Sequence, residues 1–213
     1  FPVFCSAAKN NIGVDRITEF IVNVAPTAAE MPEWETEDGK KVKCDPDGPT
    51  SLFVFKSSTE EHIGEINYFK VISGRVTENM DVVNAINSTK ERLSQIYVSA
   101  GKHRTRVPEV VAGDIAAVVE LKNTKTNHTL NSQGNNKFPN IKFPEPKYRT
   151  AIKPVSEGDE EKLGEALSRM HQEDPTVIVE YSKELKQIIL YGQGEYHLNI
   201  VKWHLDNIFK IET

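Results

Sequence analysis

Cationic side chains gather in one short stretch of this sequence, where they could bind an anionic partner. The stretch contains Lys90, Arg92, Lys102, His103, Arg104 and Arg106, and Glu91 is the one acid among them. Lysine and arginine at this density can neutralise nucleic-acid phosphates without reading bases. The alternative is a solvated strand edge, since edge strands often carry Lys and Arg. Tyr97 lies between the two halves of the stretch, but one aromatic ring does not make a stacking platform.

Other possible sites are weaker. The run Gly192-Gln193-Gly194 lacks the third glycine of a dinucleotide fingerprint and favours a tight strand-to-helix turn. His197 and His204 could share a helix face, yet no Cys, Asp or Glu completes a metal set. The sequence contains no G-x-x-x-x-G-K-[ST] phosphate loop, no Asn-Lys-x-Asp guanine reader and no nucleophile-base constellation. We therefore expect no catalytic residue and no metal ligand in this chain.

The bulk composition limits the class of protein. A net charge of −5 excludes a chain that binds nucleic acid over its whole surface, so any such contact must be local. No apolar run approaches the roughly 20 residues of a membrane span, and no signal peptide is visible. Cys5 and Cys44 show no disulfide pattern and are expected to be reduced thiols in a cytoplasmic protein.

The first 49 residues suggest the end of one domain and a connection. An apolar run at residues 1–4 is expected to be a buried strand, followed by a small-residue loop and a helix. The apolar stripe of that helix should end at Ala25, because Pro26 disfavours helix at the residue before it. Residues 26–49 are rich in Pro, Gly and acids and are interpreted as a linker. Since the chain starts inside an apolar run, we expect it to be a piece of a longer protein.

Residues 50–143 are expected to form an all-β barrel. Short β-rich runs separated by Gly, Asn and Ser turns follow one another at barrel-like spacing. The predicted strands are 52–56, 64–71, 81–84, 92–98 and 115–121. The segment 131–140 is polar and is expected to be a loop without core residues.

Residues 147–213 change to a mixed pattern. A strand at 148–153 precedes a helix with Leu163, Leu167 and Met170 on its buried stripe, and Pro175 ends that helix. Two strands at 176–181 and 186–191 surround a turn at 182–185. A last helix, with Leu198, Val201, Leu205 and Ile208 on one face, precedes the expected start of another strand at 210–212. This order predicts a ferredoxin-like split βαβ domain, truncated before its final strand.

Several words of the sequence, in this order, resemble translational GTPases of the elongation factor G family. They are SAAKN at 6–10, LFVFK at 52–56, YFKVISG at 68–74, VAGDIAAV at 111–118, FPEP at 143–146, GDEEKLGEAL at 158–167, EDPT at 173–176 and GQGEYHL at 192–198. A single such word is weak, whereas this many in order along nearly the whole chain is specific.

The resemblance implies a multi-domain α+β chain made of three parts. Residues 1–25 would be the last strand and helix of an α/β G domain, residues 50–143 the β-barrel domain II, and residues 147–213 most of the ferredoxin-like domain III. In that family the loop at Ser6, Ala7 and Ala8 contacts the guanine base, mainly through backbone groups. Without the family context, the same loop would be a simple turn with Ser6 as a helix N-cap.

The implied parent is a monomeric, cytoplasmic protein that binds GTP and magnesium, docks on the ribosome and promotes translocation of tRNA and mRNA. The piece itself would bind no cofactor and would not be catalytic. A net-acidic protein that docks on ribosomal RNA needs a local basic patch, which favours RNA contact by Arg92, Lys102, His103, Arg104 and Arg106.

The chain also departs from the family pattern. Cys5 replaces a usual Gly, and Asn79-Met80 and Asn127-His128 each replace a usual Gly-Asp. Asparagine tolerates left-handed backbone, so both turns should survive. The departures suggest a divergent paralogue or a ribosome-protection factor as one alternative. A barrel-plus-ferredoxin module that binds RNA or another partner without any GTPase is the other.

Overall fold

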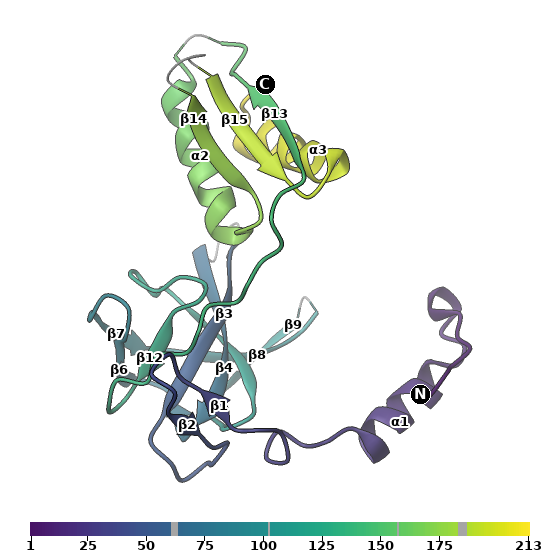
Figure 1. The fold of residues 1–213 in the computed structure, drawn as a ribbon, viewed down its shortest axis with the longest axis vertical. Coiled ribbons are helices and arrows are strands. Elements are labelled where there is room, and N and C mark those ends of the chain that lie inside the picture. Colours follow the sequence, from purple (N-terminus) through teal and green to yellow (C-terminus); the bar gives the residue numbers. More distant parts are fainter. Residues whose placement is uncertain (61–63, 102, 157, 183–186) are drawn as a thin grey trace.

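The computed structural model describes residues 1–60, 64–101, 103–156, 158–182 and 187–213 (Figure 1). The helical elements are η1 (Ala8–Asn10), α1 (Val14–Val24), α2 (Glu160–Glu173), α3 (Glu195–His204) and the π-helical turn η2 (Leu205–Phe209). The strands are β1 (Trp34–Glu35), β2 (Lys41–Val42), β3 (Ser51–Glu60), β4 (Gly64–Ser73), β5 (Arg75–Thr77), β6 (Met80–Asn84), β7 (Lys90–Leu93), β8 (Ile96–Ala100), β9 (His103–Val107), β10 (Glu109–Val111), β11 (Ile115–Val119), β12 (Thr129–Asn131), β13 (Tyr148–Ile152), β14 (Ile178–Ser182) and β15 (Gln187–Gly192).

A curled antiparallel sheet forms the barrel. In the described residues its strand order is β7-β6-β12-β3-β4-β11-β8-β9, and β5 pairs separately with β10. Alternate residues point to the two faces of each strand, so one face supplies the core. That core contains the fully buried Leu52, Val54, Phe69, Val118 and Leu130. The prediction of a β-barrel is confirmed.

The strand predicted at 92–98 is in fact two strands. β7 ends at Leu93 and β8 begins at Ile96, and both of these residues are buried in the barrel core. β7 lies at one end of the sheet order and β8 near the other, so the sheet must curl for so short a connection to join them. Alternation alone could not reveal the break, because Leu93 and Ile96 both carry core side chains.

The segment expected to be a linker contains a short hairpin, β1–β2, that packs on the outer side of the barrel. Trp34 and Val42 of the hairpin join Phe53, Ile72 and Phe138 in a second apolar cluster. The ring of Phe138 lies 5.9 Å from that of Trp34 and 6.4 Å from that of Phe53.

The prediction that residues 131–140 carry no core residue is wrong. Phe138 is fully buried, and Asn131 and Asn136 are buried beside Ser51. Ser51 Oγ donates to Asn131 Oδ1 at 2.7 Å, and Asn136 Nδ2 donates to Ser51 Oγ at 2.9 Å. A single aromatic residue among polar ones produces no periodic signal, and only the tertiary fold shows that the asparagines have partners.

Residues 148–213 form the predicted split βαβ module. In the described residues its sheet has the order β13-β15-β14, with both neighbouring pairs antiparallel, so β15 lies between the two strands that α2 connects. Leu163 and Leu167 of α2 and Leu198 of α3 pack with Leu190 of β15 in one core. The ferredoxin-like α+β prediction is confirmed, and the turn predicted at 182–185 falls mostly outside the described residues.

Two details near residue 213 differ from prediction. Ile208 is exposed, because the chain forms a wider π-helical turn after α3 and thereby leaves the predicted helix face. Lys210 then adopts a left-handed backbone (φ 57°), and Ile211 takes the buried position instead. Residues 210–212 form no strand, although the amide of Val155 donates to the carbonyl of Glu212 at 3.0 Å.

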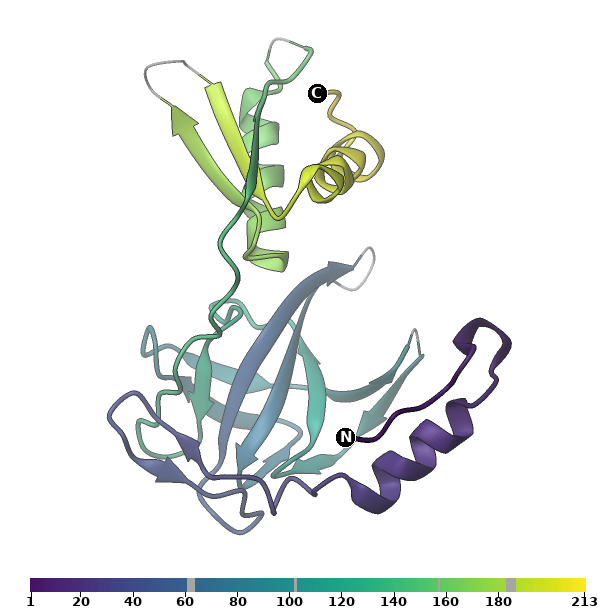
Figure 2. The same cartoon turned by 45° about the vertical axis from the view of Figure 1, so that its right-hand side comes forward.

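The first 25 residues lie apart from the barrel in Figures 1 and 2. The strand expected at residues 1–4 is not formed, because a strand requires a neighbour to pair with, and none lies beside this run in the described residues. α1 begins at Val14 after Gly13, so Ser6 is not the helix N-cap. The helix ends at Val24 with Ala25 as its C-cap, so it stops before Pro26 as predicted, but it buries no residue.

The two modules meet where α2 ends against the long β3–β4 hairpin (Figure 2). The backbone amide of Thr59 donates to Glu173 Oε1 at 3.1 Å. A hollow of about 500 Å³ beside this contact is lined by residues of both modules, including Lys56, Phe143 and Pro175. None of the described helices is long and apolar enough to cross a membrane.

Candidate nucleic-acid interface

The predicted basic patch centres on β9, an edge strand of the barrel sheet. β9 pairs only with β8 among the described strands, and it carries His103, Arg104 and Arg106. This placement agrees with both alternatives left open by the sequence, RNA contact and a solvated strand edge. Lys and Arg on an edge strand prevent pairing with other strands, and they are also accessible to a ligand. Lys102 lies outside the described residues.

Both arginines of β9 have acidic partners. Arg106 forms a two-pronged ion pair with Glu78, with Nη2 to Oε2 at 2.9 Å, and this pair holds the pKa of Glu78 below its usual value. Arg104 Nη2 contacts Glu60, and the Glu60 carboxylate and the Tyr68 hydroxyl together raise the pKa of Arg104. The patch is therefore less positive than the sequence suggests.

The two arginines nevertheless differ in how firmly they are held. The Arg106 side chain is 55% exposed, so solvent screens its ion pair with Glu78 and the pair contributes little to stability. Arg104 is 17% exposed, and its buried Nε has no hydrogen-bond partner among the described residues. Arg106 can thus leave the Glu78 carboxylate and bind a phosphate at little cost. Arg104 is largely buried and mainly has a structural role.

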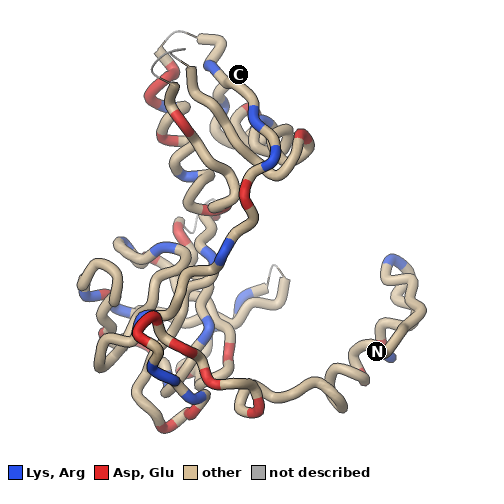
Figure 3. The backbone as a smooth tube through the Cα atoms, viewed as in Figure 1, with Lys and Arg blue, Asp and Glu red and all other residues tan. Residues whose placement is uncertain are grey.

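Arg92 does not join the arginines of β9 in one strand. It lies on β7, at the opposite end of the sheet order, opposite Asp81 in the register and 3.9 Å from its carboxylate. In Figure 1, β7 is at the left of the barrel and β9 at its right. Figure 3 shows Lys and Arg on the barrel interspersed with Asp and Glu, with no large region of one charge.

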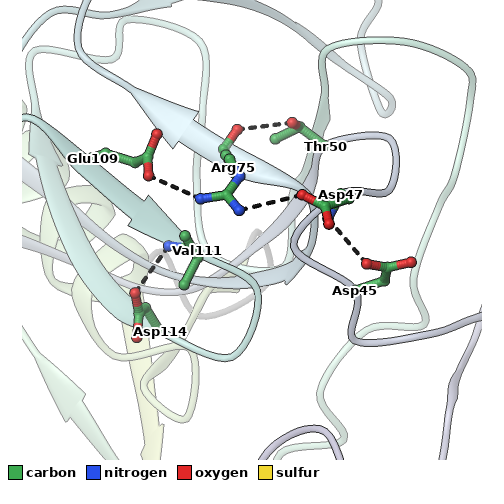
Figure 4. A network of polar contacts seen from close by, with 7 residues as sticks. All are labelled: Asp45, Asp47, Thr50, Arg75, Glu109, Val111 and Asp114. Carbon is green, nitrogen blue, oxygen red and sulfur yellow. Dashed lines mark hydrogen bonds and ion pairs between the residues drawn. The ribbon is translucent and has the colours of Figure 1, made fainter.

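Pairing of arginine with acids is general in this barrel. Arg75 of β5 lies between Asp47 and Glu109, at 3.2 and 3.1 Å (Figure 4). The Thr50 hydroxyl donates to the carbonyl of Arg75 at 2.8 Å, so this network ties the loop before β3 to β5 and β10. Arg75 has a structural role and offers no free charge for a ligand.

Sequence reasoning missed the acidic partners Glu60 and Glu78. They lie 44 and 28 positions from Arg104 and Arg106, respectively. No local pattern links residues so far apart, and only the curl of the barrel brings them together. A count of charges in the single stretch 90–106 therefore overstated its positive charge.

The predicted guanine loop is present as a compact, exposed turn. Ala7 and Ile12 exchange backbone hydrogen bonds of 3.0 and 3.2 Å, and the amide of Asn10 donates to the carbonyl of Ala7. Ser6, Ala7 and Ala8 are all exposed. The turn is tight, since a Cβ at Gly13 would lie 2.6 Å from the carbonyl oxygen of Cys5.

This loop alone does not fit a guanine nucleotide. It presents small side chains and backbone groups but no phosphate-binding element, and no other described element lies over it. The described residues also contain no group of three or more His, Cys, Asp or Glu side chains that could hold a metal ion.

The two asparagines that replace family glycines adopt the expected backbone. Asn79 has φ 61° and Asn127 has φ 73°, both left-handed, which confirms that the turns survive the replacement. His128, in the second turn, lies 2.9 Å from Asn84 Nδ2. Burial, with Lys125 nearby, lowers the pKa of His128.

Each of the two modules matches the model of one protein-domain family. Residues 49–133 match the family described as elongation factor G domain 2, and residues 143–213 match elongation factor G, domain III. An elongation factor G from Thermotoga maritima is 37% identical over the whole of this chain. The chain belongs to the elongation factor G family.

Solved structures agree with this membership. A crystal structure of a protein from Thermus thermophilus superposes on 97% of the chain with a TM-score of 0.80 and 27% identity. The chain spans only 32% of the length of the Thermotoga relative and 29% of the Thermus one. Both relatives are therefore about three times as long as the chain.

Proposed function

We propose that the chain is the part of a translational GTPase that docks on the ribosome through its barrel. The parent would promote GTP-dependent movement of tRNA and mRNA during protein synthesis, as a monomer in the cytoplasm. The observation that carries this proposal is the 37% identity to an elongation factor G in an alignment that covers the entire chain, and thus both modules. The GTP phosphates and magnesium would be held by other parts of the parent, and Ser6, Ala7 and Ala8 would contribute only the loop that contacts the guanine base.

Within this proposal, each part of the chain corresponds to a domain of the parent. Residues 1–25 would be the edge of the G domain, 26–49 a connection, 50–143 domain II and 147–213 domain III. The β1–β2 hairpin favours counting part of the connection with the barrel, since Trp34 packs in the cluster around Phe138. The detached position of α1 is what an edge element would show without the sheet that it covers.

The ribosomal contact would involve β9 of the barrel. Arg106, and Arg104 behind it, are the described cations that the fold places on one strand, with His103 beside them. Lys102 belongs to the same stretch of sequence, and Arg92 would act separately on β7. Exposed ion pairs such as Arg106–Glu78 are weak enough to open when an RNA phosphate arrives.

A divergent factor that binds the ribosome without driving translocation is the second candidate. The neutralised patch and the turn in which His128 stands where the family usually has an aspartate favour it. Such a factor would act by occupying the site, so its GTP hydrolysis would be uncoupled from movement of tRNA.

The deciding experiment is GTP hydrolysis by the full-length parent, with and without ribosomes. Strong stimulation by ribosomes is expected, because hydrolysis in this family depends on docking. Ribosome binding without stimulation would favour the divergent factor. Neither binding nor hydrolysis would contradict the proposed function, while the fold would be unaffected.

A further inference from the structure

Five residues from five neighbouring strands form one row across the barrel sheet. Tyr68 of β4 lies opposite Ala117 of β11, and Ala117 lies opposite Tyr97 of β8. The row extends to Lys56 of β3 beside Tyr68 and to Arg106 of β9 beside Tyr97. Two tyrosines thus flank an alanine, and a cation stands at each end.

This row lies on the outer face of the sheet. Phe69, Val118 and Ile96, each next in sequence to a member of the row, are buried in the barrel core. Successive residues of a strand point to opposite faces, so Tyr68, Ala117 and Tyr97 point outward.

The spacing leaves room for planar ligands. Adjacent strands are about 4.8 Å apart, which separates the two tyrosines by about 10 Å and the terminal cations by about 19 Å. Ala117 is buried although it points outward, so the side chains around it cover it. Tyr68 and Tyr97 are each partly exposed. Together the two tyrosines form a partly exposed aromatic surface on either side of Ala117.

We propose that this row binds unpaired RNA bases, which stack on Tyr68 and Tyr97 while Lys56 and Arg106 contact the flanking phosphates. The inference rests on the proposed docking on ribosomal RNA and adds which part of the RNA is bound. Aromatic rings bind any base through its π face, and cations at both ends suit a backbone that crosses the strands.

Single-stranded RNA fits this surface better than a duplex. In a duplex the base faces are covered by their neighbours, and recognition relies on phosphates and 2′-hydroxyls, for which the tyrosines would be of no use. The Tyr68 hydroxyl also interacts with the Arg104 guanidinium, which adds a third cation to this face of the sheet.

The test is binding of a fluorescent, unstructured 12-nucleotide RNA to the 213-residue chain by anisotropy at low salt. Removal of one stacking ring costs about 1–3 kcal/mol, so Tyr68→Leu and Tyr97→Leu should each weaken binding roughly 5- to 150-fold. Tyr97→Phe, which keeps the ring, should bind as the unaltered chain does. Arg106→Gln should lower the salt slope by about 0.7, the value for one lost contact to a single strand.

Tyr181→Leu, which alters an exposed tyrosine of the other module, is the matched control and should change nothing. Circular dichroism of each variant verifies folding. The proposal is overturned if the unaltered chain does not bind the single strand, or if the two Leu variants bind it normally. Annealing the same RNA to its complement should abolish the tyrosine effect.

Ribosome sedimentation separates this inference from the proposed function. If Tyr68→Leu and Tyr97→Leu sediment with ribosomes normally while Arg106→Glu does not, docking holds and base stacking is wrong. If ribosome binding needs the tyrosines but free RNA does not bind, the surface contacts a ribosomal protein instead, which also overturns the inference.

Discussion

The N-terminal segment and the barrel were both predicted to carry a site, and they differ in what surrounds it. Residues 1–25 form a helix with an apolar stripe, yet none of its residues is buried. The barrel surrounds its predicted patch with partners, including Glu60, Glu78 and Tyr68. Local sequence is sufficient to form a helix, but a site requires neighbours that only tertiary structure supplies.

The largest expected difference between the two regions is in stability. Phe69→Ala should lower the free energy of unfolding of the barrel by about 3–5 kcal/mol, because it leaves a cavity in a close-packed core. Phe20→Ala in α1 should change it by less than about 0.5 kcal/mol, since α1 buries no residue and the Phe20 ring packs on Phe4 of the same segment. Urea denaturation followed by Trp34, which packs on the barrel, measures both.

Equal effects of these two substitutions would show that α1 packs on the barrel in solution. Both substitutions are made in a chain that also carries Trp203→Phe. This change removes the tryptophan fluorescence of the α+β module, so that the remaining emission reports the barrel alone.

A smaller effect is expected from releasing Arg106. Glu78→Gln removes the acidic partner and should tighten binding of single-stranded RNA up to about 5-fold, because it frees Arg106 from an ion pair that solvent already weakens. Fluorescence anisotropy measures the change. Glu109→Gln, which alters a partner of Arg75 instead, is the control and should leave RNA affinity unchanged. If the Glu78→Gln variant binds single-stranded RNA more weakly, the Arg106–Glu78 pair holds Arg106 in the position that binds RNA, which contradicts this prediction.

The smallest expected effect is on the pH dependence of the stability of the α+β module, through Asp174. Burial alone would raise the pKa of Asp174, but bonds from Thr176 and the nearby His197 outweigh it and lower the pKa. A lowered folded-state pKa means that the ionised carboxylate stabilises the module above about pH 3.9, the unfolded value. That contribution is lost as the pH falls through the folded-state pKa.

Asp174→Asn should therefore be less stable than the unaltered chain from pH 7 to 5, and the difference should shrink below about pH 4. Denaturation followed by Trp203, in a Trp34→Phe background, measures it at each pH. A difference that stays constant down to pH 3 would contradict the role given to the carboxylate.

Much of the fold could be predicted where burial follows a local period. The alternation around Phe69 predicted β4, and Leu163 and Leu167 predicted α2, because in each case one face of one element meets the core. Phe138 could not be predicted as a core residue, since its polar neighbours give no period and its partners Trp34 and Phe53 are distant in sequence.

The candidate site was predictable only in part. The cations of β9 were visible in the sequence, but their neutralisation by Glu60 and Glu78 was not. The row that joins Lys56 to Arg106 spans 50 positions and depends on the register of five strands. Tyr97 alone gave no reason to expect a stacking surface, because its counterpart Tyr68 comes from a strand that is not adjacent to β8.

The most direct test of the account is sedimentation of the chain with ribosomes after charge reversal on β9. The account predicts that Arg106→Glu reduces binding at least about 10-fold, since it removes a phosphate contact and adds repulsion. Lys41→Glu, which makes the same charge change at an exposed position of β2, should bind as the unaltered chain does. Equal binding by both variants would contradict docking through β9.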